Sequence, residues 1–183
     1  MINPARDVTA FVLSIDKRPE SQTLQDCATA TGISMTEQEN NRNEEDYVGE
    51  IKGGLRPTMR LIVMGIVHKQ PRSMEVLVSC QSKGEGDDEI EGDVGLELKV
   101  KFPEKTVLRN ARLSGKWGTS ESALSFFPFA PGEAFKMEIV CEHQQFRVLV
   151  DGQPLCGFAH RLTHLGSLNA LRVHGDLQLT KVA

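Results

Sequence analysis

Short segments in which apolar and polar residues alternate most constrain the fold of this chain. In residues 95–102, GLELKVKF, every second residue is apolar, and the residues between them are Glu97, Lys99 and Lys101. Alternation with a period of two is typical of a β-strand that buries one face. The segment therefore predicts a strand with one face in a core. Its charged face is either solvated surface or the floor of a binding site.

The same kind of segment recurs through most of the chain. Turn signals such as Asp151-Gly152 separate the segments about every 8–12 residues, and no long segment has the helical period. A single helical turn is expected around 163–168. The pattern predicts an all-β protein, an antiparallel β-sandwich, with strands in the following ranges: 60–67, 74–80, 95–102, 106–113, 135–141, 145–151, 154–158, 168–174 and 176–182.

The N-terminal part of the chain differs from the rest in composition. Residues 34–46, SMTEQENNRNEED, contain one apolar residue, which is too few to offset the entropy lost on ordering. Residues 1–47 carry four Lys/Arg against nine Asp/Glu, so much of the negative charge lies there. We expect an acidic, largely disordered tail over 1–46 and a folded domain over 47–183.

Bulk composition excludes several classes of protein. A net charge of -4 and a pI near 5.8 argue against nucleic-acid binding by bulk electrostatics. No apolar run approaches the roughly 18 residues of a membrane span, so no membrane insertion is expected. The cysteines have no CxxC spacing and favour free thiols in a reducing compartment, which predicts a cytoplasmic protein. They are Cys27, Cys80, Cys141 and Cys156.

Three groups of residues resemble reactive or metal-binding sites but have simpler explanations. Cys141 and His143 resemble a nucleophile beside a base, yet a core cysteine before a turn histidine explains them as well. His160 and His164 have the spacing of a helical metal pair without further ligands. The acidic loop 83–93 lacks the register of a calcium loop. We expect no enzyme activity, no metal and no cofactor.

Trp117 is the only tryptophan, and it lies between Lys116 and Gly118 rather than inside an apolar run. A flat aromatic face beside polar strands suits stacking on a sugar ring or a cation. The alternative is a tryptophan that simply covers the surface of the sheet.

Five segments together resemble the galectins: DVGLELKVKF, RNARLSGKWG, FPFAPGEAF, CEHQQFRVLVDG and HGDLQLTKV. The resemblance runs in order over about residues 47–183. Within the family the chain is most similar to the galectin-related proteins, a branch with a degenerate sugar site. The resemblance implies a jelly-roll sandwich of two antiparallel sheets, with the sugar groove on the concave sheet.

The resemblance also implies where the sugar contacts would lie. A sugar-binding galectin carries His-x-Asn-Pro-Arg, then an Asn on the next strand, then Trp-Gly-x-Glu-x-Arg. Only the next-strand Asn and the Trp are kept here. The seven corresponding positions, which form a degenerate carbohydrate-binding groove, are Glu97, Lys99, Lys101, Asn110, Trp117, Ser120 and Ser122.

These replacements lead to two hypotheses. In the first, the protein has lost most β-galactoside contacts, does not bind lactose, and acts through an unidentified protein partner. In the second, it is a lectin of altered specificity that stacks a glycan on Trp117 and uses Lys99, Lys101 and Arg112 to favour anionic glycans. Both are compatible with a monomer or a homodimer, and with export from the cytoplasm without a signal peptide.

Overall fold

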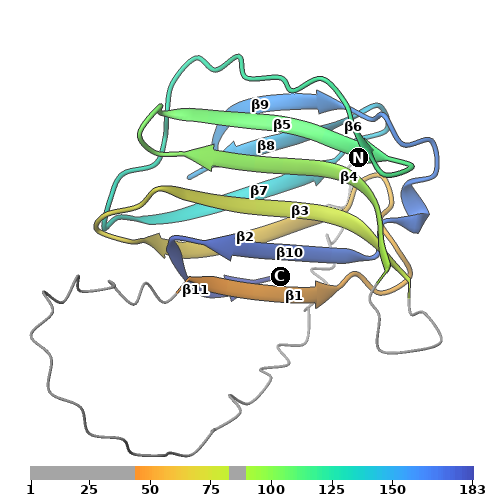
Figure 1. The fold of residues 1–183 in the computed structure, drawn as a ribbon, viewed down its shortest axis with the longest axis horizontal. Coiled ribbons are helices and arrows are strands. Elements are labelled where there is room, and N and C mark those ends of the chain that lie inside the picture. The colour runs from red at the N-terminus through yellow and green to blue at the C-terminus, as the bar shows by residue number, and fades with distance from the viewer. Residues whose placement is uncertain (1–43, 83–89) are drawn as a thin grey trace, which may run out of the picture.

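The computed structural model describes residues 44–82 and 90–183, and there the chain forms two stacked antiparallel sheets (Figure 1). The six-stranded sheet has the order β1 (Glu45–Glu50), β10 (Ala170–Gly175), β3 (Ser73–Ser82), β4 (Ile90–Lys101), β5 (Thr106–Leu113) and β6 (Lys116–Trp117). The five-stranded sheet has the order β11 (Leu177–Val182), β2 (Arg60–Val67), β7 (Ala134–Cys141), β8 (Gln145–Val150) and β9 (Gln153–Ala159). The predicted all-β sandwich is confirmed.

The observed strands coincide closely with the alternating segments. The predicted strand 106–113 is β5 residue for residue, and the helical turn expected around 163–168 is the 3-10 turn η1, Leu165–Ser167. Asp151 and Gly152 have φ of 50° and 78°, the left-handed values that a tight type I′ hairpin turn requires.

Two strands were not predicted. The edge strand β1 begins at Glu45 within the acidic stretch, where its residues alternate poorly in hydrophobicity. The other, β6, has only two residues, too few for any periodicity to show.

The core lies between the sheets and takes the apolar face of each strand. On β4 the side of Leu96, Leu98 and Val100 is fully buried, each residue being 0% exposed. Burying three such side chains stabilises the fold by about 1.5–3 kcal/mol each. Phe127 and Phe129 bring the bend between β6 and β7 into the same core, edge-to-face with Phe102.

Several expectations fall on other parts of the chain. Residues 1–43 of the predicted acidic tail, which include Cys27, lie outside the described residues. Residues 83–89 of the acidic loop lie outside them as well. Among the described residues, no helix has the length and apolarity that a membrane crossing needs.

Candidate functional site

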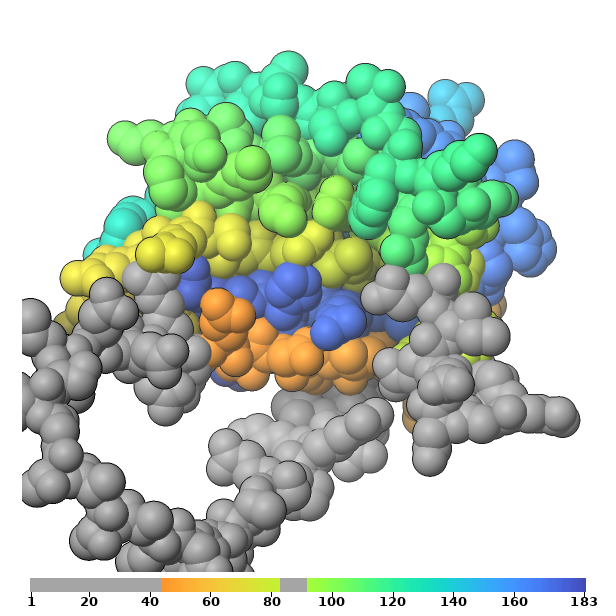
Figure 2. Space-filling view, in the orientation of Figure 1, coloured from red at the N-terminus to blue at the C-terminus, as the bar shows by residue number. Residues whose placement is uncertain are grey.

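Strand pairing brings the polar faces of four strands together on the outer face of the six-stranded sheet. In the antiparallel register His174 of β10 lies opposite Glu75 of β3, and Glu75 lies opposite Lys99 of β4. Two residues before Lys99 on β4, Glu97 lies opposite Asn110 of β5. Figure 2 shows this face, with β3 in yellow between the blue of β10 and the green of β4 and β5. We call it the outer face below.

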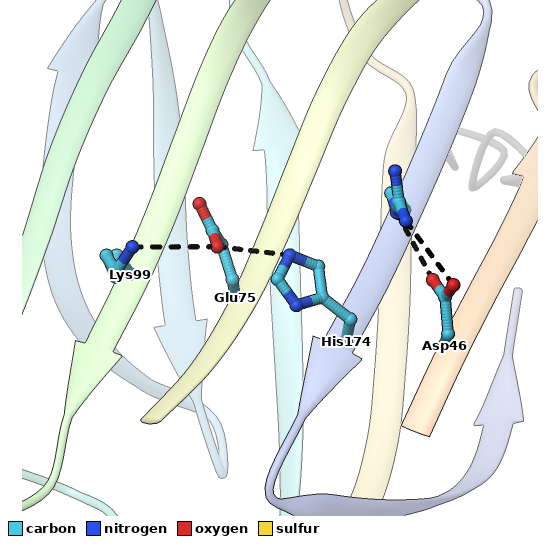
Figure 3. A network of polar contacts seen from close by, with 5 residues as sticks. Asp46, Glu75, Lys99 and His174 are labelled. Carbon is cyan, nitrogen blue, oxygen red and sulfur yellow. Dashed lines mark hydrogen bonds and ion pairs between the residues drawn. The ribbon is translucent and has the colours of Figure 1, made fainter. Parts of the chain in front are cut away.

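A line of ionic contacts crosses three strands of the outer face (Figure 3). Glu75 Oε2 lies 3.0 Å from Nε2 of His174 and 3.8 Å from Nζ of Lys99. On the neighbouring edge, Nε of Arg172 lies 3.2 Å from Oδ1 of Asp46 on β1. The ion pair of Lys99 therefore joins β4 to β3.

Glu75 also shares a hydrogen bond with Glu97, which makes a carboxyl pair in the middle of the outer face. The hydrogen bond from His174 lowers the pKa of Glu75 to about 2. Burial, followed by the hydrogen bond and the charge of Glu75, raises the pKa of Glu97 to about 7. Two adjacent carboxyls do not readily ionise together, so the pair holds one proton up to neutral pH.

The side-chain amide of Asn110, a residue that is 6% exposed, is fully engaged within the protein. Its Nδ2 donates to the carbonyl oxygen of Gly118 at 3.0 Å and to Oγ of Ser120 at 3.3 Å. Its Oδ1 accepts from the backbone N–H of Ala111 at 2.9 Å and from Nη1 of Arg161 at 3.1 Å. An amide has two N–H donors and two lone pairs, so this set uses its full capacity.

Arg161, from the loop after β9, ties the segment after Trp117 to β5. Its Nη2 donates to the carbonyl oxygen of Thr119 at 2.7 Å, and its guanidinium carbon lies 4.6 Å from the ring centroid of Phe158. A Cβ added at Gly118 would lie 2.6 Å from Nη1, so the guanidinium would have to move from its position against Asn110.

Trp117 lies on β6 at the edge of the outer face and is 45% exposed. The guanidinium carbon of Arg112 lies 5.5 Å from the centroid of its ring, within the range of a cation–π contact. Ser120 and Ser122 are both exposed on the segment that follows. The indole therefore keeps an accessible surface.

The structure places all seven predicted positions on the outer face or on the segment at its β6 edge. Sequence reasoning did not identify Glu75, His174 and Arg161 as part of this arrangement. Alternation within β3 puts Glu75 on a polar face, but only the strand register shows that it lies opposite Lys99. Arg161 lies in a loop, where no periodic signal indicates its direction.

The reactive-residue hypotheses fit the structure poorly. The Cys141 side chain points into the core, where burial raises its pKa to about 11. Such a thiol is protonated at neutral pH and a weak nucleophile. Nε2 of His160 lies 2.8 Å from the carbonyl oxygen of Glu142. Within 44–82 and 90–183 no three His, Cys, Asp or Glu side chains gather in a way that could hold a metal ion.

Comparison with known proteins gives a family match for most of the chain. Residues 46–183 match the family model described as galactoside-binding lectin. Among curated proteins, Galectin-4 of pig (Sus scrofa) is 34% identical and human Galectin-4 (Homo sapiens) 32%, each over 136 residues. Each of these alignments covers 74% of this chain but only 40% of the relative.

Among solved structures, sheep Galectin-11 in complex with glycerol superposes with a TM-score of 0.62 at 24% identity. The superposition covers 75% of this chain and 95% of that chain. At this identity the likeness supports the fold alone.

Proposed function

Since the family model matches residues 46–183, the chain belongs to the galectins, the galactoside-binding lectins, and on that premise we propose a function for its outer face. We propose that this galectin-fold protein has lost most β-galactoside contacts, does not bind lactose with useful affinity, and acts by binding another protein. Residues 47–183 form the binding unit in this proposal, and 1–46 are an acidic tail outside it.

The state of Asn110 carries the proposal. Of the polar positions that a sugar-binding galectin uses, it is the one kept here, and its amide is saturated by Gly118, Ser120, Ala111 and Arg161. A sugar hydroxyl would have to displace one of these hydrogen bonds, so its contact with Asn110 would add little to the free energy of binding. A polar group that is already hydrogen-bonded within the protein adds to ligand affinity only when the ligand brings it a further hydrogen bond.

The charged residues of β4 add little for a neutral sugar. Lys99 is held by Glu75, and a lysine ammonium cannot present the planar fork of an arginine. Losing two or three hydrogen bonds at about 1–2 kcal/mol each weakens binding by roughly two to four powers of ten. We therefore place the chain nearest to the galectin-related proteins, although the relatives compared above carry the name Galectin-4.

Isothermal titration of the full chain with lactose tests this proposal, with the fluorescence of Trp117 recorded in parallel. We expect no saturable heat, no shift in emission and no retention on lactose–agarose. Saturable binding with a Kd below about 1 mM, abolished by Trp117→Ala, would contradict it.

A second candidate function is that of a lectin for anionic glycans. Two observations favour it: the exposed face of Trp117, and the absence of an ion pair for Lys101 with any other described residue. A glycan array checks this candidate. A consistent acidic hit that Trp117→Ala removes would support it, and an array without acidic hits would exclude it.

We also propose that the protein resides in the cytoplasm. The support is that Cys80, Cys141 and Cys156 are free thiols, as expected in a reducing compartment.

A further inference from the structure

We propose that residues 8–15 of the N-terminal tail dock within the same chain onto the outward surface of the five-stranded sheet. There they cover a strip formed by Ile62, Met64 and Ile66 of β2, called the β2 strip below. The inference concerns the sheet opposite the outer face and does not depend on the proposed function.

Strand β2 is apolar on both of its faces. Alternation puts Leu61, Val63 and Val67 in the core, each at most 3% exposed, and turns the β2 strip outward. Ile66 is 38% exposed, and the other two residues of the strip are half-buried. The outward face of a solvated antiparallel sheet is ordinarily polar. Three apolar residues in line on that face therefore indicate a surface that another segment covers.

The charged residues beside the β2 strip on β2 and β7 are already paired with one another. Glu138 of β7 lies opposite Ile62. Its Oε1 lies 2.9 Å from Nη1 of Arg60 and 3.1 Å from Nζ of Lys136. Ions that are paired within the protein gain little from a further charged ligand. The strip therefore offers apolar contact, which favours an apolar occupant.

The tail joins the folded domain close to the β2 strip. Strands β1 and β11 lie side by side at one edge of the sandwich (Figure 1), where Oε2 of Glu45 accepts a hydrogen bond from the backbone N–H of Leu179 at 3.1 Å. Leu179 lies opposite Gly65 of β2, the residue before Ile66. Since neighbouring strands are about 4.8 Å apart, β1 begins within about 15 Å of the strip.

Residues 8–15, VTAFVLSI, are the most apolar eight-residue segment of the 43 residues that precede the described ones, with six apolar residues of eight. In an extended chain Phe11, Leu13 and Ile15 share one face. They have the same spacing, every second residue, as the three residues of the β2 strip. The segment therefore matches the strip both in chemistry and in spacing.

The connection between the segment and β1 is long enough for this contact. Residues 16–44 comprise 29 residues, and a flexible chain of that length has a root-mean-square end-to-end distance of about 30 Å. Such a tether gives an effective concentration on the order of 1 mM. A contact with a Kd of about 0.3 mM between separate molecules would then be occupied about three-quarters of the time within one chain.

Methyl NMR of the full chain, labelled at isoleucine and methionine methyl groups, tests the proposal because each residue of the β2 strip gives a signal. Leu13→Asp should weaken docking about tenfold, since burial of a leucine side chain contributes at least that factor, and should lower the occupancy to about one quarter. The strip signals should then move about two-thirds of the way to their positions in the double variant Phe11→Asp/Leu13→Asp, in which docking is lost.

Two matched controls assign the effect to this pair of surfaces. Leu24→Asp puts the same charge elsewhere in the tail and should leave the strip signals unchanged. In an Ile66→Thr background, the other two strip signals should respond to Leu13→Asp less than half as far as in the parent. Val48→Thr, which alters a residue that is 46% exposed on the other sheet, should leave the response complete.

Three outcomes would overturn the inference. The strip signals could stay in place in Leu13→Asp and in the double variant, or Leu24→Asp could move them as far as Leu13→Asp does. Alternatively, they could move as the protein is raised from about 20 to 500 μM, which would assign the strip to a second copy of the chain. Failure of the proposed function is a separate result, because lactose binding would change the emission of Trp117 on the other sheet.

Discussion

Replacing Arg161 by Ala removes the side chain that ties the segment after Trp117 to β5. Two hydrogen bonds are lost, to Oδ1 of Asn110 at 3.1 Å and to the carbonyl oxygen of Thr119 at 2.7 Å. The guanidinium contact with the ring of Phe158, at 4.6 Å, is lost as well. Oδ1 of Asn110 keeps the backbone N–H of Ala111, so it is not left without a partner.

The expected cost follows from these contacts. Hydrogen bonds from a charged donor contribute about 1.5–3 kcal/mol each when shielded and less when exposed, and the ring contact about 0.5–1 kcal/mol. Since the bond to Thr119 is exposed, we expect Arg161→Ala to lower the free energy of unfolding by about 2–4 kcal/mol. Urea denaturation followed by the fluorescence of Trp117 measures this and also reports whether the indole becomes more exposed.

Arg147 offers a matched control, because its ion pair with Glu142 joins two partly exposed side chains. Arg147→Ala should cost no more than about 1 kcal/mol. Arg161→Lys should recover only part of the loss, since an ammonium cannot serve both acceptors in one plane. If Arg161→Ala were as stable as Arg147→Ala, and Trp117 emission were unchanged, the assigned role of Arg161 would be wrong.

Three further predictions concern single residues. Gly118→Ala places a Cβ 2.6 Å from Nη1 of Arg161. It should therefore lower the free energy of unfolding by about 1–2 kcal/mol in the parent and by much less in the Arg161→Ala background. Urea denaturation of the single and double variants measures both values. Burial acts to raise the pKa of Glu138, but hydrogen bonds from two basic neighbours lower it. Its contribution to stability is therefore complete above the pKa of unfolded Glu, about 4.3, and lost as pH falls, so Glu138→Gln should show a smaller drop in Tm between about pH 5 and 3. Cys141, whose pKa is about 11 in the core, should resist thiol labelling at neutral pH until the protein unfolds, and rapid modification in the native state would contradict this.

Periodicity in the sequence was enough to predict most of the fold. Alternation in β4 and β5 identified the strands because each buries one face, and the Asp151-Gly152 pair marked its turn because two left-handed residues are needed there. The edge strand β1 escaped notice because two of its exposed residues, Asp46 and Glu50, are charged and the third, Val48, is apolar but 46% exposed. A strand that buries few apolar side chains shows little alternation of apolar and polar residues in its sequence.

The candidate site was predictable only in part. The resemblance to the galectin motifs identified Glu97, Asn110 and Trp117, which lie on the successive strands β4, β5 and β6. Partners from distant segments, such as Glu75 and Arg161, depend on strand register and on the path of a loop, which one sequence does not specify. As a result, the resemblance predicted which sugar contacts are replaced, but not that the Asn110 amide is already engaged.

An NMR titration of the ¹⁵N-labelled protein with lactose tests the central claim most directly, because the side-chain amide of Asn110 and the indole N–H of Trp117 each give a signal of their own. If the amide is held by its four internal hydrogen bonds, neither signal should move in a saturable way as lactose is raised to about 50 mM, some 50 times a millimolar Kd. Saturable shifts of both signals with a common Kd below about 1 mM would show that the amide exchanges its partners for a sugar, and the claim would fail.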